Sequence, residues 1–357
     1  MKIEHGGALH LKNDKITIKP IEAKYKEAQL RLFNQTFGKS FSLPQWTHKH
    51  FENPYVDSSE NIGIFDGSKL IGFNMFMPQE YFVNGQKKLF LQSCESVIDS
   101  NYRGYGYLGK VLQQAERILS KQYPVIYGIP NDKSKRTFEK LGYKIKFQFD
   151  EMRIIGNRIS LLKELIVRTC NRIRKDSISI NEKKILEGKL IASNNVELLD
   201  RLPTNWNPEV GSGIKINNSS DFYDWKISSN QKEHMVRKFV CLRSNGIIKA
   251  FCVVAFSAVS GSCRGEILDV FCLENEKDSL KDIFCYLKKC CSVVTMLVPE
   301  SGALKTFLLK EGFHVHHEKV APLIYKSIQE DAIELEAVLE EPNNWEFHFI
   351  EADTVLN

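Results

Sequence analysis

Residues 96–110 decide the fold of this chain, and they read SVIDSNYRGYGYLGK. The apolar start of this stretch predicts a strand that ends near Ile98, and the apolar spacing from Tyr107 onward predicts an amphipathic helix. Between strand and helix, Gly104 and Gly106 make a turn in which no Cβ blocks access to the backbone. A helix that begins directly after such a turn presents unpaired N–H groups at the positive end of its dipole. The pattern therefore favours a phosphate-binding loop, although glycines can also merely shape a tight turn.

Two common nucleotide-binding motifs do not fit this stretch. A Walker A loop needs Gly-Lys-Ser/Thr at a fixed distance after its first glycine, and residues 104–110 lack it. A dinucleotide fingerprint needs a different glycine spacing and repeated strand–helix–strand units around it. Here the preceding strands are joined by hairpins instead.

The segments around the loop predict a mixed sheet with helices packed on it. Asp66-Gly67 and Asn84-Gly85 each lie between runs of strand-forming residues, which is a strong hairpin signal. After the helix at 107–122, a strand is expected at 125–129 and a second helix at about 133–140. The expected fold class is therefore α+β, with a largely antiparallel sheet flanked by helices.

The second half of the chain repeats this order, which indicates an internal duplication. Trp46 lies 21 residues before Gly67, and Trp225 lies 21 residues before Gly246. Further along, YGIPNDKSKRTFEKLGYKI in the first half resembles MLVPESGALKTFLLKEGFHV in the second. We therefore expect an N-terminal domain at 1–152, a basic helical linker at 153–185 and a degenerate second copy at 186–357.

The loop and the segment after it resemble the GNAT superfamily of acetyl-CoA-dependent N-acetyltransferases. The pyrophosphate loop of that family reads Q/R-x-x-G-x-G/A, and Arg103 and Gly106 occupy its first and fourth positions. Its sixth position is Leu108 here, which departs from the pattern. A second family element, Pro-Asn at a strand end followed by a short helix, matches Pro130-Asn131. The resemblance covers about residues 16–150 and, more weakly, 186–320.

The resemblance implies acetyl-CoA, or another acyl-CoA, as a co-substrate. The acyl-CoA would bind where the strand of Val97 and the strand at 125–129 diverge. Asn131 and Ser134 would line the cofactor on the far side, and a backbone N–H near Ile98 would polarise the thioester carbonyl. The backbone N–H groups that would hold the pyrophosphate belong to Arg103, Gly104, Tyr105, Gly106, Tyr107, Leu108 and Gly109.

The resemblance also predicts transfer of the acyl group to a primary amine. Glu95 is the candidate general base, directly or through water, and its simpler interpretation is an exposed edge carboxylate. Many family members have, where this chain has Phe138, a tyrosine that donates a proton to the leaving thiolate. Tyr127, Tyr107 or solvent could supply that proton, so the sequence assigns no general acid.

The second copy is expected to bind no CoA. No glycine follows its strand at 267–273, and the acids Glu274, Glu276 and Asp278 stand where phosphate would lie. We expect this copy to shape or cover the acceptor site. An amino sugar, an amino acid or a small amine is the expected acceptor. Two alternatives stay open: an aminoacyl transferase of the peptidoglycan cross-bridge type, and a non-catalytic acyl-CoA-binding or scaffold protein.

Composition excludes several other classes of protein. The chain has 357 residues, 43% hydrophobic and 26% charged, and its formal net charge of +5 is too small to predict a nucleic-acid-binding protein. No apolar stretch is long enough to span a membrane, and the N-terminus does not read as a signal peptide. The nine cysteines lie mostly in apolar runs, which predicts free thiols in a cytoplasmic protein. The histidine pairs lack matching carboxylates or cysteines, so no metal is expected.

Residues 157–175 predict a basic amphipathic helix. Seven basic residues and one acid lie between Arg153 and Lys175, and apolar residues recur at helical spacing. A linker helix that packs on the first domain is one interpretation. Peripheral contact with an anionic membrane surface is the other.

Overall fold

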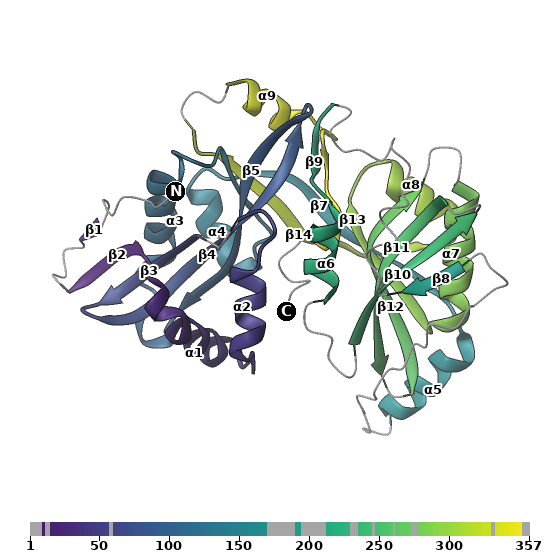
Figure 1. Ribbon diagram of the computed structural model, residues 1–357. Helices are drawn as coiled ribbons and strands as arrows, with labels where there is room; N and C mark the ends of the chain where they lie inside the picture. Colours follow the sequence, from purple (N-terminus) through teal and green to yellow (C-terminus); the bar gives the residue numbers. More distant parts are fainter. Residues whose placement is uncertain are drawn as a thin grey trace. The chain divides into compact units, whose positions relative to one another are not determined.

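The computed structural model describes residues 9–10, 15–56, 60–169, 190–193, 212–228, 235–244, 247–259, 261–272, 277–329 and 333–351 (Figure 1). The chain divides into two compact units. Unit 1 comprises residues 1–146, 211–217 and 322–345, and unit 2 comprises residues 147–210, 218–321 and 346–357.

The first half of the chain contains strands β1 to β7 and helices α1 to α5. In chain order these are β1 (Leu9–His10), β2 (Ile16–Pro20), α1 (Lys26–Phe37), α2 (Leu43–Phe51), β3 (Glu60–Asp66), β4 (Lys69–Val83), β5 (Gln86–Ile98), α3 (Tyr107–Leu119), β6 (Val125–Gly128), α4 (Asp132–Lys140), β7 (Lys144–Ile155) and α5 (Arg158–Thr169).

The second half follows a similar order after two short strands. Its elements are β8 (Leu190–Ser193), β9 (Ile214–Ile216), α6 (Ser220–Ser228), β10 (Met235–Ser244), β11 (Ile247–Val259), β12 (Ser262–Cys272), α7 (Lys277–Cys290), β13 (Val293–Pro299), α8 (Ala303–Lys310), β14 (His314–Ser327), α9 (Ile333–Glu340) and β15 (Trp345–Glu346).

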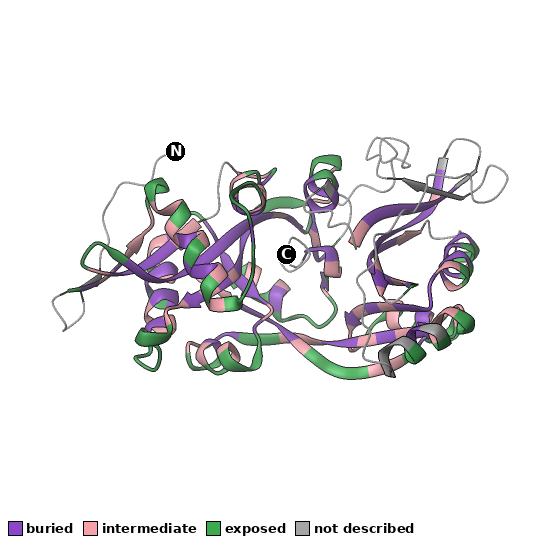
Figure 2. Cartoon of the chain, turned by 90° about the horizontal axis from the view of Figure 1, so that it is seen from below, coloured by how far each residue is buried: buried purple, intermediate pink, exposed green. Residues whose placement is uncertain are grey.

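Unit 1 is a sheet with helices on both faces. Strands β1 to β5 pair in chain order, all antiparallel, and β5 then pairs in parallel with β6. Because side chains alternate along a strand, Ile64 packs with α3 on one face and the neighbouring Phe65 packs with α1 and α2 on the other. Both faces are therefore buried, as the colouring of the strands in Figure 2 shows.

The predicted hairpins of unit 1 are confirmed. Gly67 adopts a left-handed φ of +60°, and at the second turn Asn84 and Gly85 have φ of +48° and +80°. Two successive positive φ values are what a tight two-residue hairpin loop requires, and Asn-Gly supplies them at low cost. These turns fix the register of β3, β4 and β5, on which the candidate site depends.

Unit 2 repeats this pairing pattern. Strands β10, β11 and β12 are antiparallel in chain order, and β12 pairs in parallel with β13. One core cluster joins the sheet to α7 and α8 through residues such as Phe256, Ile283 and Phe313. Together the two units confirm the predicted α+β class with a largely antiparallel sheet.

The two units are interleaved along the chain, unlike the contiguous ranges 1–152 and 186–357 that the sequence predicts. Strand β7 follows α4 of unit 1, yet it pairs with β13 of unit 2 from Phe149 to Ile155. In return, β14 follows α8 of unit 2 and pairs with β6 of unit 1 from Ile324 to Ser327. Each half thus contributes a strand to the sheet of the other, which no local sequence signal encodes.

The expected linker also differs from the observed structure. Residues 153–155 belong to β7, and the helix α5 begins only at Arg158. The expected helix continues to residue 175, and the part beyond Thr169 lies outside the described residues. Within the described residues α5 packs on β12 of unit 2, whereas one interpretation of the sequence placed it on the first domain.

Candidate active site

The glycine-rich loop leaves the N-terminus of α3 open. Gly104 and Gly106 have left-handed φ values of +88° and +72°, and Gly106 is the N-cap residue with no side-chain cap. The first N–H groups of α3, on Tyr107, Leu108 and Gly109, have no partner within the helix. A Cβ built on Gly104 or Gly106 meets no atom within 4 Å. The loop therefore offers backbone donors beside open space.

Three polar contacts brace this loop. The Asp99 carboxylate accepts a hydrogen bond from the Asn101 N–H at 3.0 Å, and the Tyr102 hydroxyl donates to Asp66 at 2.8 Å. Arg103 donates through Nε to the Ile98 carbonyl at 3.1 Å. The Arg103 side chain thus closes the turn back onto the end of β5, which explains a basic residue at the first position of the loop.

Strands β5 and β6 stop pairing close to this loop. Their parallel register runs from Leu91↔Ile126 to Ser93↔Gly128 and ends there. Directly beyond, the register of β5 against β4 shifts at Cys94 and Glu95, which is a bulge in β5. The predicted divergence of the two strands is therefore present, and the bulge marks where it begins.

Beyond the bulge, the Ile98 N–H points away from β4. The Asp99 N–H donates to the Ile71 carbonyl at 2.9 Å, so Asp99 is in a hydrogen-bonded pair across β4 and β5. Successive residues of an antiparallel strand alternate, so the Ile98 N–H faces the side on which β6 has diverged. The side chain of the preceding residue, Val97, is buried in the core cluster that contains Trp46.

On the other strand, Asn131 and Ser134 begin helix α4. The Asn131 side chain accepts hydrogen bonds from the N–H groups of Lys133 and Ser134 at 3.0 and 3.1 Å, as an N-cap residue does. The Ser134 hydroxyl donates back to the Asn131 carbonyl at 3.2 Å. Helix capping thus accounts for the Pro-Asn pattern at this position.

Phe138 and the two tyrosines that could protonate the leaving thiolate, Tyr127 and Tyr107, are buried in unit 1. Phe138 is buried against Tyr143, with ring centroids 4.9 Å apart. The Tyr127 hydroxyl accepts a hydrogen bond from Tyr81 at 2.9 Å, and both side chains are buried. Tyr107 is 9% exposed at the start of α3.

Glu95 is the centre of a buried charged cluster, not an exposed edge carboxylate. It is 6% exposed, and its Oε1 accepts a hydrogen bond from the Lys49 ammonium. Its Oε2 lies 3.4 Å from Nε2 of His50, which is fully buried. Lys49 and His50 both come from α2, so this helix supplies a cation and an imidazole to the bulge of β5.

His50 is held in its neutral form. Burial lowers the pKa of His50 well below its usual range, and the neighbouring Lys49 charge lowers that pKa further. The ring also packs against Trp46, with centroids 4.4 Å apart and the ring planes tilted by 56°. Trp46, Lys49 and His50 share one face of α2 at i, i+3 and i+4 spacing. A lysine and a histidine on the apolar face of a helix are the signal that could have revealed this cluster from the sequence.

Further polar side chains are buried along the same strands. Asn74 of β4 donates to the Ser93 hydroxyl of β5 at 3.1 Å and accepts from the Ser96 hydroxyl. Gln79 donates to Gln92 at 2.8 Å. Sheet interiors are normally apolar, so this concentration of amides and hydroxyls around the bulge distinguishes the region from the rest of the core.

Unit 2 has a comparable carboxylate on its own bulged strand. Asp269 of β12 lies next to a register shift against β11, and its Oδ2 accepts a hydrogen bond from the Tyr223 hydroxyl of α6 at 2.5 Å. The segment that would correspond to the glycine-rich loop includes Glu274 and Glu276, which lie outside the described residues. The expectation that acids exclude phosphate there stays a prediction.

The histidine pairs do not assemble a metal site. His48 pairs with Glu52 at 2.8 Å on the more exposed side of α2, whereas His50 is buried beside Glu95. Within the described part of the chain, no group of three His, Cys, Asp or Glu side chains has a metal-binding arrangement. The cysteines that the structure describes are all free thiols.

Comparison with known proteins agrees with this geometry. Residues 17–146 match a protein-family model described as an acetyltransferase (GNAT) domain. Comparison with curated proteins gives no match.

Several solved structures are similar over both halves of the chain. A GCN5-related N-acetyltransferase from Anabaena variabilis aligns with a TM-score of 0.61 at 14% identity, over 88% of this chain and 73% of that one. A probable N-acyltransferase from Enterococcus faecalis gives 0.61 at 12% identity, over 88% and 72%. A putative acetyltransferase from Pyrococcus horikoshii gives 0.53 at 10% identity, over 97% and 96%. At these identities the likeness shows a shared fold.

Proposed function

We propose, from the match of residues 17–146 to a GNAT acetyltransferase domain model, that the protein transfers an acyl group from acyl-CoA to a primary amine. The observation that carries the proposal is the open N-terminus of α3 beside the point where β5 and β6 diverge. The pyrophosphate of a nucleotide needs hydrogen-bond donors of this kind. The arm of acyl-CoA that carries the thioester needs a gap between strands.

In this proposal the loop at 103–109 binds the pyrophosphate of acetyl-CoA. The unpaired N–H groups of the first turn of α3 donate to phosphate oxygens, and the helix dipole favours their negative charge. Gly104 and Gly106 allow close approach, since a Cβ there would project into the space that the phosphates occupy. Asn131 and Ser134 are the proposed contacts on the α4 side.

The thioester carbonyl is proposed to lie beside Ile98. Its N–H points away from β4 and can donate to the carbonyl oxygen when negative charge develops there during attack by the amine. The pair β4–β5 holds this N–H rigidly, so no reorganisation is needed at the moment of reaction. Val97 contributes backbone rather than a side-chain contact, because its side chain is in the core.

Glu95 is the proposed general base. It accepts the proton that the amine loses as the new C–N bond forms, directly or through water. Lys49 holds one carboxylate oxygen in place, so Lys49 is a positioning residue. Neutral His50 lies 3.4 Å from the other oxygen, and Glu95 releases its proton to water after the acylated product leaves. The leaving CoA thiolate takes a proton from Tyr107, Tyr127 or solvent, because Phe138 has no hydroxyl.

The alternative is a non-catalytic acyl-CoA-binding protein, and one observation favours it. Glu95 is buried and bound by Lys49, as in a purely structural ion pair. Both functions require acyl-CoA on the same loop, so binding is the first property to test, and turnover distinguishes them afterwards. The weaker alternative, transfer from aminoacyl-tRNA, does not require the loop.

Thermal unfolding with and without acetyl-CoA tests the binding step. A ligand at about 100 times its Kd stabilises the protein by about 2.7 kcal/mol, which shifts the unfolding temperature by several degrees. Gly106→Glu places a carboxylate where the phosphates bind and should abolish the shift. Gly38→Glu is the matched control: Gly38 is also left-handed, with φ of +61°, and also has open space around it, but it ends α1. No shift in the wild type at millimolar acetyl-CoA would overturn the proposal.

A further inference from the structure

Helix α5 is firmly attached to unit 2 at its N-terminal end. The N–H of Gly156 donates to the Ser292 carbonyl at 3.0 Å, and the N–H of Asn157 donates to the Cys291 carbonyl at 2.7 Å. The Asn157 side chain then caps the helix by accepting a hydrogen bond from the Ser160 N–H at 3.1 Å. The orientation of α5 on this unit is thereby fixed.

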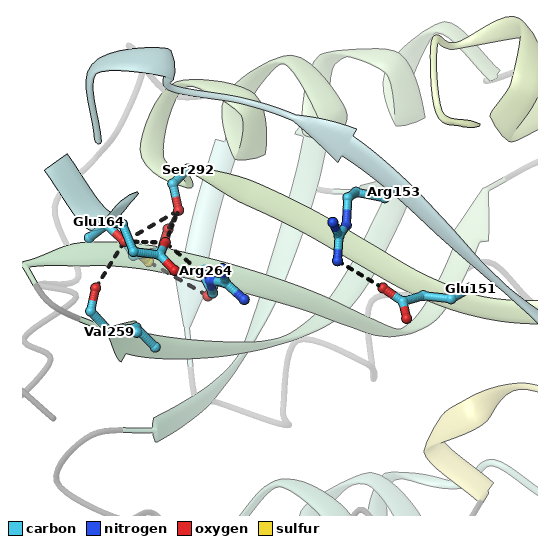
Figure 3. Close-up of polar contacts among 8 residues, drawn as sticks. Glu151, Arg153, Glu164, Val259, Arg264 and Ser292 are labelled. Carbon is cyan, nitrogen blue, oxygen red and sulfur yellow. Dashed lines mark hydrogen bonds and ion pairs between the residues drawn. The ribbon is translucent and has the colours of Figure 1, made fainter. Parts of the chain in front are cut away.

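A buried carboxylate anchors the middle of the helix. Glu164 is 1% exposed and accepts hydrogen bonds from Nε and Nη2 of Arg264 at 3.1 and 2.5 Å. The hydroxyl of Ser262 donates to the same carboxylate at 2.8 Å and that of Ser292 at 3.3 Å. Figure 3 shows this carboxylate pointing into unit 2. The one acidic residue of the basic segment 153–175 therefore faces inward, with its charge compensated.

The opposite side of α5 carries large apolar side chains in solvent. Ile159 is 70% exposed, Leu162 59%, Leu165 53% and Ile166 54%. At about 100° per residue these four positions lie within an arc of about 120°, and Glu164 lies roughly opposite its centre. We call these four residues the apolar stripe. A contiguous exposed stripe of this kind marks a contact surface rather than an ordinary solvated helix.

The charges that accompany the stripe are basic. Arg158 is exposed at the start of the helix, and the helical sequence also contains Lys163 and Arg168. The sequence of α5 contains one acid, and that residue is the buried Glu164. A helix of basic net charge with an exposed apolar stripe and the exposed Arg158 is complementary to a surface that is apolar inside and anionic outside.

We propose that α5 binds the surface of an anionic lipid bilayer, with the apolar stripe inserted among the lipids and the basic residues among the headgroups. The contact is peripheral, since no helix in the described part of the chain is long and apolar enough to cross a bilayer. A second protein copy is a poorer match, because charge of one sign beside the stripe would repel itself across a symmetric interface. This inference does not depend on the acyltransferase proposal.

Sedimentation of the full-length protein with vesicles tests the proposal. We expect binding to vesicles of phosphatidylcholine and phosphatidylglycerol at low salt, little binding to phosphatidylcholine alone, and weaker binding as salt rises. Leu162→Glu should weaken the partition by about tenfold or more, because a charge replaces a leucine that the lipids would bury in the bound state. Arg158→Glu should weaken binding to anionic vesicles and reduce its salt dependence.

The matched control is Leu309→Glu. Leu309 lies on α8 of the same unit and is 47% exposed, so this change adds the same charge at a similar apolar surface position. It should bind vesicles like the wild type. Unchanged binding by Leu162→Glu, or equal binding to neutral vesicles, would overturn the proposal. A second pair of results would also overturn it: no vesicle binding, together with a dimer in gel filtration that Leu162→Glu dissociates. The apolar stripe would then be an interface between two copies.

Discussion

Lys49 of α2 and Glu95 of β5 form an almost fully buried ion pair, 46 residues apart in the chain, at the bulge of β5. In unit 2 the hydroxyl of Tyr223 on α6 donates to Asp269 on β12, and these residues are also 46 positions apart. Each contact joins the helix before a hairpin to a carboxylate at a bulged strand. Lys49 follows Trp46 by three residues whereas Tyr223 precedes Trp225 by two, so the two partners occupy different positions of their helices.

The chemistry of the two carboxylates differs accordingly. Glu95 has a cation on one side and the neutral imidazole of His50 on the other. Asp269 is bound by Tyr223 and by His348. A buried ion pair stabilises a fold only weakly, because desolvation offsets most of the attraction. In the proposed function, this pair positions Glu95 for proton transfer at the bulge of β5.

Replacement of Lys49 and Glu95 by uncharged residues distinguishes a role of this pair in stability from a role in catalysis. Lys49→Met alone should destabilise unit 1 by about 3–5 kcal/mol, because it leaves the buried Glu95 carboxylate without its cation. The double variant Lys49→Met/Glu95→Gln removes both charges and should regain most of this loss. It should also keep the acetyl-CoA-dependent thermal shift while acyl transfer falls by about 10²-fold or more.

Urea unfolding and a coupled thiol assay with an amine panel supply the two readouts. The single variant Glu95→Gln provides the comparison for the double variant, since both lack the proposed base. Turnover by the double variant at the wild-type rate would remove Glu95 from the mechanism and leave it a structural role.

Local sequence signals predicted unit 1 well. The turns at Asp66-Gly67 and Asn84-Gly85 and the helix after Gly106 depend on φ preferences and short-range periodicity, which neighbouring residues determine. The divergence of β5 and β6 followed from the resemblance to a known family. The two turns and the start of the helix are each specified by neighbouring residues, whereas Ser93 of β5 and Gly128 of β6 are 35 positions apart.

The interleaving and the charged cluster could not be predicted in the same way. Exchange of β7 and β14 depends on which strand edges are available after each helix, and the alternating pattern of a strand does not specify its partner. The contact of Lys49 and His50 with Glu95 depends on how α2 packs across the sheet. Lys49 and His50 on the apolar face of α2 are an unusual feature of the sequence, but apolar spacing does not identify Glu95 as their partner.

Trp345 should be essential for unit 1, although it lies near the end of the chain. Its ring packs against Tyr81, Phe90 and Tyr127 at centroid distances of 5.3–5.7 Å, and it is 3% exposed. We expect Trp345→Ala to cost about 3–5 kcal/mol of unfolding free energy, through lost burial and the cavity left behind. Urea unfolding followed by circular dichroism measures this cost.

The control for that variant lies in the same C-terminal segment. Ile333 is 79% exposed at the start of α9, so Ile333→Ala should change stability by less than about 0.5 kcal/mol.

A fragment of residues 1–152 lacks Trp345 and β14 and should fail to fold. A stable fragment would show that the first half needs no completion by the C-terminal segment.

Gly156 should tolerate no side chain. A Cβ built there lies 2.2 Å from the Cys291 carbonyl oxygen and 2.6 Å from that of Lys288, both backbone atoms. Gly156→Ala must displace the start of α5, at a cost of about 1–3 kcal/mol, and should speed amide exchange throughout this helix. Gly109→Ala is the opposite case: Gly109 lies in α3, the atom nearest to the added Cβ is the Thr137 methyl of α4 at 3.6 Å, and the change should stabilise by up to about 1 kcal/mol. Hydrogen exchange that is unchanged in α5 would show that the helix is held elsewhere.

His348 should make the stability of unit 2 depend on pH. Burial alone would lower the pKa of His348, but its contact with Asp269, aided by Glu346, holds that pKa well above its usual range. The protonated form is therefore favoured in the folded state. The contribution of His348 to the free energy of unfolding is complete below the pKa of the unfolded state, near 6.5. It is lost as pH rises through the pKa of the folded state.

Urea unfolding of the full-length protein between about pH 6 and about pH 9 tests this dependence. The wild type should lose stability toward the alkaline end, and His348→Gln should lose less over the same interval, so the difference between the two proteins shrinks as pH rises. Asp269→Asn removes the carboxylate that holds the imidazolium and should flatten the same dependence. Tyr223, the other neighbour of Asp269, has its pKa raised by burial and by that carboxylate, so it stays protonated throughout and does not contribute. A difference between wild type and His348→Gln that is constant across the interval would mean that His348 does not titrate with folding.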